Sequence, residues 1–115
     1  MPRYLILGKY SAEGLSSAME EGFASREDAA RQLIEALGGQ FEGMYFCAAL
    51  SGFDFTMMVT LPGSEPLHIM SLVASTSPAF ADGGMAIELK TGSEADASAA
   101  AMREAMSQYR PPGSD

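Results

Sequence analysis

The chain has 115 residues, 47% of them apolar, which is enough for one domain with its own core but too little for two. Its formal net charge of −8 opposes binding to nucleic acid or to an anionic membrane surface, because the phosphate groups would be repelled. No apolar run is long enough to span a bilayer, and no signal-peptide pattern opens the chain. The single cysteine, Cys47, excludes an internal disulfide and favours a reducing, cytoplasmic location.

The first predicted elements are one strand and two helices. Residues 4–9 are rich in β-forming side chains and predict a strand. A short helix over residues 11–19 follows, with Ser11 as its cap. A firmer helix is predicted to begin at Ser25, since Asp28 stands three residues later as in a capping box. Its apolar residues have the spacing of one buried stripe, and Gly38-Gly39 ends it: Ala30, Leu33, Ile34 and Leu37.

A β-hairpin over residues 44–59 has the clearest pattern in the chain. A two-residue turn at Ser51-Gly52 predicts its register. The predicted pairs are Leu50 with Phe53, Ala48 with Phe55 and Phe46 with Met57. One face is then apolar throughout, and the other is half-polar: Tyr45, Cys47, Ala49, Asp54, Thr56, Met58 and Thr60. Because neither face suits open water, we expect both to be covered.

The second half of the chain predicts a helix, a strand and a further helix. The helix over residues 64–76 has Ser64 as its cap and Pro66 in its first turn. The strand covers residues 85–89. The last helix, over residues 94–109, has one apolar stripe: Ala95, Ala99, Met102, Met106 and Tyr109. We expect residues 1–110 to form one domain and residues 111–115 a loose tail.

These elements predict an α+β fold of the ferredoxin-like βαββαβ type with an extra C-terminal helix. Right-handed crossovers would place both main helices on one face of a four-stranded antiparallel sheet. The helices would cover the apolar face of the hairpin and leave its half-polar face open. We therefore expect the chain to form a homodimer or a higher homo-oligomer through the helix-free face.

Several short motifs resemble the GYD domain proteins, a family of small bacterial proteins grouped with the dimeric α+β barrels. They are Tyr4-Leu5-Ile6-Leu7-Gly8-Lys9-Tyr10, Glu13-Gly14, Leu37-Gly38-Gly39, Gly52-Phe53-Asp54 and Leu61-Pro62, and they stand in order within residues 3–90. Phe53 replaces the tyrosine of the Gly-Tyr-Asp motif, which removes a hydroxyl group. The resemblance implies a fold and a mode of dimerisation, and it transfers no catalytic residues.

Asp54, Tyr45 and His68 are the candidate catalytic residues. A carboxylate withdrawn from water beside the turn suits a general acid or base, and Tyr45 would share its face. The alternative for Asp54 is a cap on nearby backbone N–H groups. His68 belongs to a serine-lined stripe, which is more often simply a solvated face. Lys9 and Tyr10, at the end of the first strand, are candidate ligand-binding residues in a polar cleft.

The sequence predicts neither a metal site nor a cofactor. His68 is the only histidine, Cys47 the only cysteine, and no glycine-rich phosphate loop follows a strand. The predicted function is a homodimerising module that is non-catalytic or binds a small ligand. The alternatives are a cofactor-independent oxygenase or isomerase and a regulatory subunit, and an internal cavity would favour a ligand or an enzyme.

Overall fold

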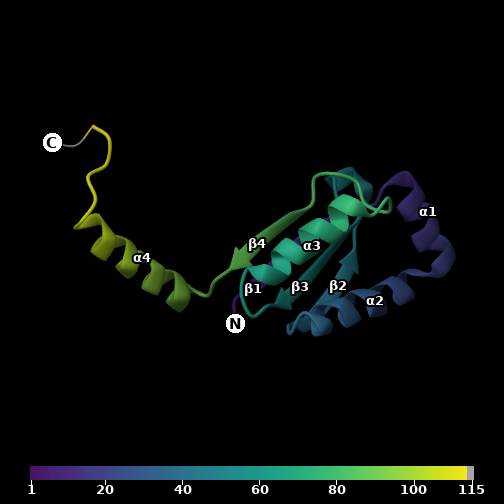
Figure 1. Cartoon of the computed structure of the whole chain (residues 1–115), viewed down its shortest axis with the longest axis horizontal. Coiled ribbons are helices and arrows are strands. Elements are labelled where there is room, and N and C mark those ends of the chain that lie inside the picture. The colour runs from purple at the N-terminus through teal and green to yellow at the C-terminus, as the bar shows by residue number, and fades with distance from the viewer. Residues whose placement is uncertain (114–115) are drawn as a thin grey trace.

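The structure of the protein is a computed structural model that describes residues 1–113. Its elements are, in order, β1 (Arg3–Gly8), α1 (Ala12–Glu21), α2 (Phe23–Ala36), β2 (Gln40–Phe46), the short 3-10 helix η1 (Ala49–Ser51), β3 (Phe55–Thr60), α3 (Glu65–Thr76), β4 (Met85–Leu89) and α4 (Gly92–Met106). The four strands form one antiparallel sheet in the order β2-β3-β1-β4 (Figure 1). This confirms the predicted α+β arrangement, which is compatible with a ferredoxin-like fold.

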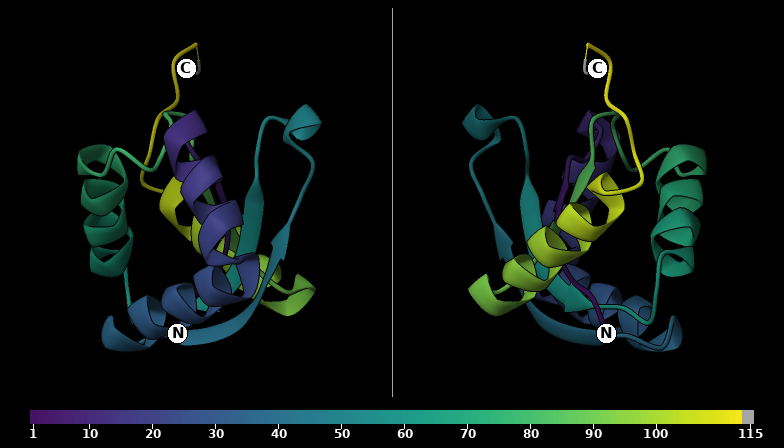
Figure 2. Two further views of the ribbon diagram at one scale, coloured as in Figure 1. Left: turned by 90° about the vertical axis from the view of Figure 1, so that its right-hand side faces the viewer. Right: turned by 90° about the vertical axis from the view of Figure 1, so that its left-hand side faces the viewer.

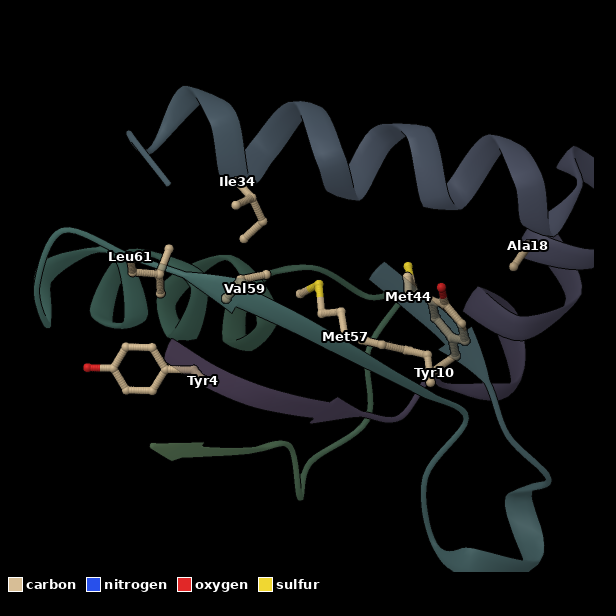
Figure 3. Packing of buried hydrophobic residues seen from close by; sticks show 9 residues of the cluster. Tyr4, Tyr10, Ala18, Ile34, Met44, Met57, Val59 and Leu61 are labelled. Carbon is tan, nitrogen blue, oxygen red and sulfur yellow. The ribbon is translucent and has the colours of Figure 1, made fainter. Parts of the chain in front are cut away.

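The core lies between one face of the sheet and the helices α1, α2 and α3. Ile34 points from α2 toward β3, where Val59 is fully buried, and Leu61 just after β3 is fully buried as well (Figure 3). Leu67 and Met70 of α3 pack against the same cluster. The apolar face predicted for the hairpin is therefore the face that the helices cover.

The predicted turn of the hairpin is wrong. The observed pairs are Phe46 with Phe55, Tyr45 with Thr56 and Met44 with Met57. The strands separate after Cys47, whose N–H donates to the carbonyl oxygen of Asp54 over 2.9 Å, and η1 lies within the connection. The register differs from the predicted one by two residues, an even number, so each residue that does remain in the strands keeps its predicted face. Leu50, predicted in the apolar face, is instead fully exposed.

The four predicted helix starts have different outcomes. The last helix begins at Gly92, two residues before its predicted start, with Thr91 as its cap. Ser11 caps α1 as predicted, since its side chain accepts a hydrogen bond from the N–H of Gly14. The second helix begins at Phe23, before the predicted capping box, and Ser25 donates to Glu21 instead. Ser64 precedes α3 without a side-chain cap bond. Gly38 ends the second helix region with a φ of 82°, in the region that favours glycine.

Helix α4 projects from the end of β4 and gives the molecule its elongated shape, 61 × 29 × 24 Å (Figure 1). The radius of gyration is 17.7 Å, whereas a compact chain of about 100 residues has about 13 Å. All α4 side chains are exposed except that of Ala99, which is half-buried. The further views in Figure 2 show α3 on one side of the molecule and the β2–β3 connection on the other.

Residues 114 and 115 of the predicted tail lie outside the described residues. Between residues 1 and 113, no helix combines the length and apolar character needed to cross a membrane.

Candidate functional site

A cavity of about 380 Å³ lies between α3 and the sheet. Ile6 on β1 and Phe55 and Met57 on β3 line its floor, and α3 forms the opposite wall. The loop that joins α3 to β4 closes one side through residues 80–84. The wall is mainly apolar, which is typical of small-molecule sites.

The cavity exists because the facing side chains become small along α3. Leu67 and Met70, near the start of the helix, reach the core. The next residues of the same stripe are Ser71, Ala74 and Ser75, and all three line the cavity. Across from them lie further small residues: Ala81, Gly83, Gly84 and Ala86. These side chains are too short to fill the space between helix and sheet.

The loop beside the cavity is fastened to the end of β1. The N–H of Ala81 donates to the carbonyl oxygen of Lys9, and the N–H of Ser11 donates to that of Ala79, each over 2.9 Å. The ring of Phe80 stacks on Tyr10, with centroids 5.6 Å apart. Lys9, a predicted ligand-binding residue, lines the cavity together with Asp82. No ion pair involving the Lys9 ammonium group is present within residues 1–113.

Asp54 has a positioning role rather than a free carboxylate. It is buried just before β3, and its Oδ2 accepts a hydrogen bond of 2.8 Å from the N–H of Tyr10. Its own N–H donates to the carbonyl oxygen of Gly8 over 2.9 Å. Asp54 therefore binds a backbone N–H group, as the alternative prediction expects, but this group lies just after β1 and not in the turn. These bonds fix the point where Lys9 and Tyr10 leave the sheet.

Tyr10, the other predicted ligand-binding residue, faces a second cavity of about 350 Å³. Burial raises the pKa of the Tyr10 phenol, and the nearby Arg26 guanidinium partly offsets this shift. Arg26 also forms an ion pair of 3.4 Å with Glu21, and both residues line this cavity. The rings of Tyr10 and Phe80 line it as well.

The three candidate catalytic residues do not converge. Tyr45 is 73% exposed on the edge strand β2, and His68 is exposed on α3. Neither of the two cavities is lined by Asp54, Tyr45 or His68. Cys47, predicted on the half-polar face of the hairpin, is exposed just beyond β2, and its thiol donates to the carbonyl oxygen of Phe53 over 3.3 Å.

The helix-free face of the sheet is more apolar than the hairpin alone predicts. The register places Leu5 between Met58 and Ile87, all on this face. The next row along the sheet holds further members: Tyr45, Thr56, Leu7 and Met85. Leu5 and Leu7 are half-buried, and Met58, Met85 and Ile87 are exposed. Uncovered apolar patches of this kind are typical of interaction surfaces.

Sequence reasoning missed the cavity and the residues Arg26, Glu21 and Phe80. The sequence feature that could have indicated the cavity is the run of small residues along α3. It indicates a cavity only when the residues across from α3 are known to be small as well. Within the described ranges, no three His, Cys, Asp or Glu side chains are grouped so that they could hold a metal ion. Comparison of the chain with family models, curated proteins and solved structures found no match.

Proposed function

We propose that this protein is a small-molecule-binding module that acts as a homodimer, with the cavity between α3 and the sheet as its binding site. The cavity itself is the observation that carries the proposal. Its volume, about 380 Å³, falls within the roughly 300–1,000 Å³ of small-molecule sites. Small side chains line it on both sides, from α3 and from the segment around the start of β4.

The lining favours a compact apolar or aromatic ligand with an anionic group at one end. Phe55, Met57 and Leu67 offer an apolar surface, and Lys9 offers a cation that has no carboxylate partner within residues 1–113. A ligand carboxylate would give this ammonium group a charge-assisted hydrogen bond. Asp82, also at the lining, would disfavour ligands with negative charge elsewhere.

We do not propose an oxygenase or isomerase. The carboxylate of Asp54 already accepts the Tyr10 N–H, and Tyr45 and His68 lie outside both cavities. No proton-transfer pair among the candidate residues thus faces a ligand in the cavity.

The homodimer is supported by the exposed apolar residues of the helix-free face, among them Met58, Met85 and Ile87. The resemblance to the GYD domain proteins agrees with a dimer and stays a prediction. We also propose a cytoplasmic location, because a free exposed cysteine such as Cys47 persists in a reducing compartment.

The ligand site can be tested with a pair of fluorescent probes that share aromatic rings but differ in charge. Anilinonaphthalene sulfonate is anionic, and N-phenylnaphthylamine is neutral. We expect Ala74→Phe, which fills the cavity, to weaken both probes by about tenfold or more. Leu72→Phe is the matched control, since Leu72 lies on α3 but not in the cavity lining.

The role of Lys9 needs a separate comparison. Lys9→Met should weaken the anionic probe and leave the neutral probe unchanged. Lys90→Met is the control, because it removes the same charge from a residue outside the cavity.

Equal binding of both probes to wild type, Ala74→Phe and Leu72→Phe would refute the proposed binding site, since the probes would then be bound elsewhere.

A further inference from the structure

Helix α4 has an apolar stripe that no part of residues 1–113 covers. Met102 is 54% exposed and Met106 is 41% exposed, and Tyr109 just beyond the helix is exposed as well. The side of the helix that carries them also carries Ala95 and Ala99, so a partner surface could approach closely. Isolated helices of about 15 residues are only marginally stable in water. We therefore expect α4 to need a surface against which to pack.

The base of α4 is oriented away from the sheet by several hydrogen bonds. The Arg3 guanidinium donates to the carbonyl oxygen of Leu89 over 3.2 Å and to Glu94 over 2.9 Å. Glu94 and Thr91 also form a capping box, and the Lys90 ammonium group donates to Ser98 over 2.7 Å. Such exposed contacts contribute little stability individually. Together they set the direction of the helix, and folding back onto its own sheet would break them.

The described residues thus present two uncovered apolar surfaces, the α4 stripe and the helix-free sheet face, and the two do not meet within one copy. We infer that two copies exchange their α4 helices, each laying its Met102–Met106 stripe across the helix-free face of the other copy. This inference rests on the homodimer of the proposed function and identifies the α4 stripe and the helix-free sheet face as the surfaces that form its interface. Reciprocal exchange closes a two-fold dimer and leaves neither surface open for a third copy.

The dimensions of the two surfaces agree. A helix of 15 residues is about 22 Å long and about 10 Å wide, and a six-residue strand such as β1 is about 20 Å long. Each arm would cover roughly 220 Å² of the sheet, so two arms, counted on helix and sheet, bury roughly 900 Å². Interdigitating side chains add to this footprint, which then reaches the roughly 1,000 Å² that a specific interface needs.

The test is the mass of the full-length chain in solution, measured by light scattering after size-exclusion chromatography. The chain mass is 12.1 kDa, so we expect about 24 kDa for wild type. Met102→Glu with Met106→Glu should halve the mass. Ala97→Glu with Ala100→Glu, on the opposite side of α4, adds the same charge and should leave the dimer intact. Glutamate is a good helix former, and circular dichroism will verify that both variants fold.

A variant of the sheet face separates arm exchange from direct sheet-to-sheet pairing. Ile87→Glu places a charge on the helix-free face at an exposed position and should also give a monomer. If Ile87→Glu is monomeric while the Met102/Met106 variant stays dimeric, the sheets pair directly; arm exchange is then wrong and the proposed homodimer stands. A monomeric wild type would refute the dimer altogether, whereas probe binding to the cavity would still be measurable. Masses above that of a dimer would overturn the closed exchange.

Exchange also predicts a specific cross-link between chains. One chain would carry Met106→Cys with an affinity tag and the other Ile87→Cys, both with Cys47→Ser. A bismaleimide should join the tagged chain to the untagged one, and Ala97→Cys in place of Met106→Cys should reduce this product severalfold. Equal cross-linking from both sides of α4 would contradict the inference.

Discussion

The contact between Gly8 and the ring of Phe55 gives a sharp test of the core. The two residues are paired across β1 and β3, and a methyl group added at Gly8 would lie 2.1 Å from Cζ of the ring. The ring is not free to move aside, because Tyr10 and Phe80 lie against it with centroids 5.1 and 6.3 Å away. We expect Gly8→Ala to lower the free energy of unfolding by about 1–3 kcal/mol, the usual cost of overpacking.

Removing the ring should abolish that cost. Phe55→Ala alone should lower the free energy of unfolding by about 3–5 kcal/mol, since Phe55 is buried. In the Phe55→Ala background the added methyl at Gly8 occupies vacated space, so Gly8→Ala should then be close to neutral. The coupling free energy between the two positions is therefore about 1–3 kcal/mol.

Urea denaturation at one fixed protein concentration, followed by circular dichroism, measures all four members of this cycle. Gly63→Ala is the control, because no heavy atom lies within 4 Å of a methyl group added there. It should change the free energy of unfolding by no more than about 0.5 kcal/mol. The reasoning fails if Gly8→Ala costs the same with and without the Phe55 ring.

Two further predictions concern single side chains. Asp54→Ala should lower the free energy of unfolding by about 1–3 kcal/mol, since it leaves the buried N–H of Tyr10 without its acceptor. Asp54→Asn keeps an acceptor oxygen and should lower it clearly less. Equal losses for the two variants in urea denaturation would contradict the positioning role. Hydrogen bonds from the Thr91 backbone and the Arg3 side chain lower the pKa of Glu94 from 4.5 to about 2. The Glu94 carboxylate therefore stabilises the start of α4 above about pH 4.5, and this stabilisation is lost as the pH falls toward about 2. The protection of the α4 amide protons, expressed relative to their intrinsic exchange rates at each pH, should therefore fall over this range, and a Glu94→Gln chain with the same pH response would refute the assignment.

The local pattern of the chain determined the elements and their faces. Alternation with a period of two placed Phe55, Met57 and Val59 on the buried face, and this survived a turn that was wrongly placed, since the register differs by an even number of residues. The bounds of β4 and the cap of α1 at Ser11 also agree with prediction. These features depend on neighbours along the chain, so a single sequence contains them.

Contacts between distant residues decided the rest. The acceptor role of Asp54 depends on a N–H group 44 residues away, and the cavity depends on small residues of α3 facing small residues near β4. The direction of α4 depends on Arg3 at the other end of the chain. Each of these features can be recognised only when the order of the strands is known, because only the folded sheet places β1 between β3 and β4. The sequence alone therefore predicts which surfaces are apolar, whereas the tertiary structure decides which of them remain uncovered.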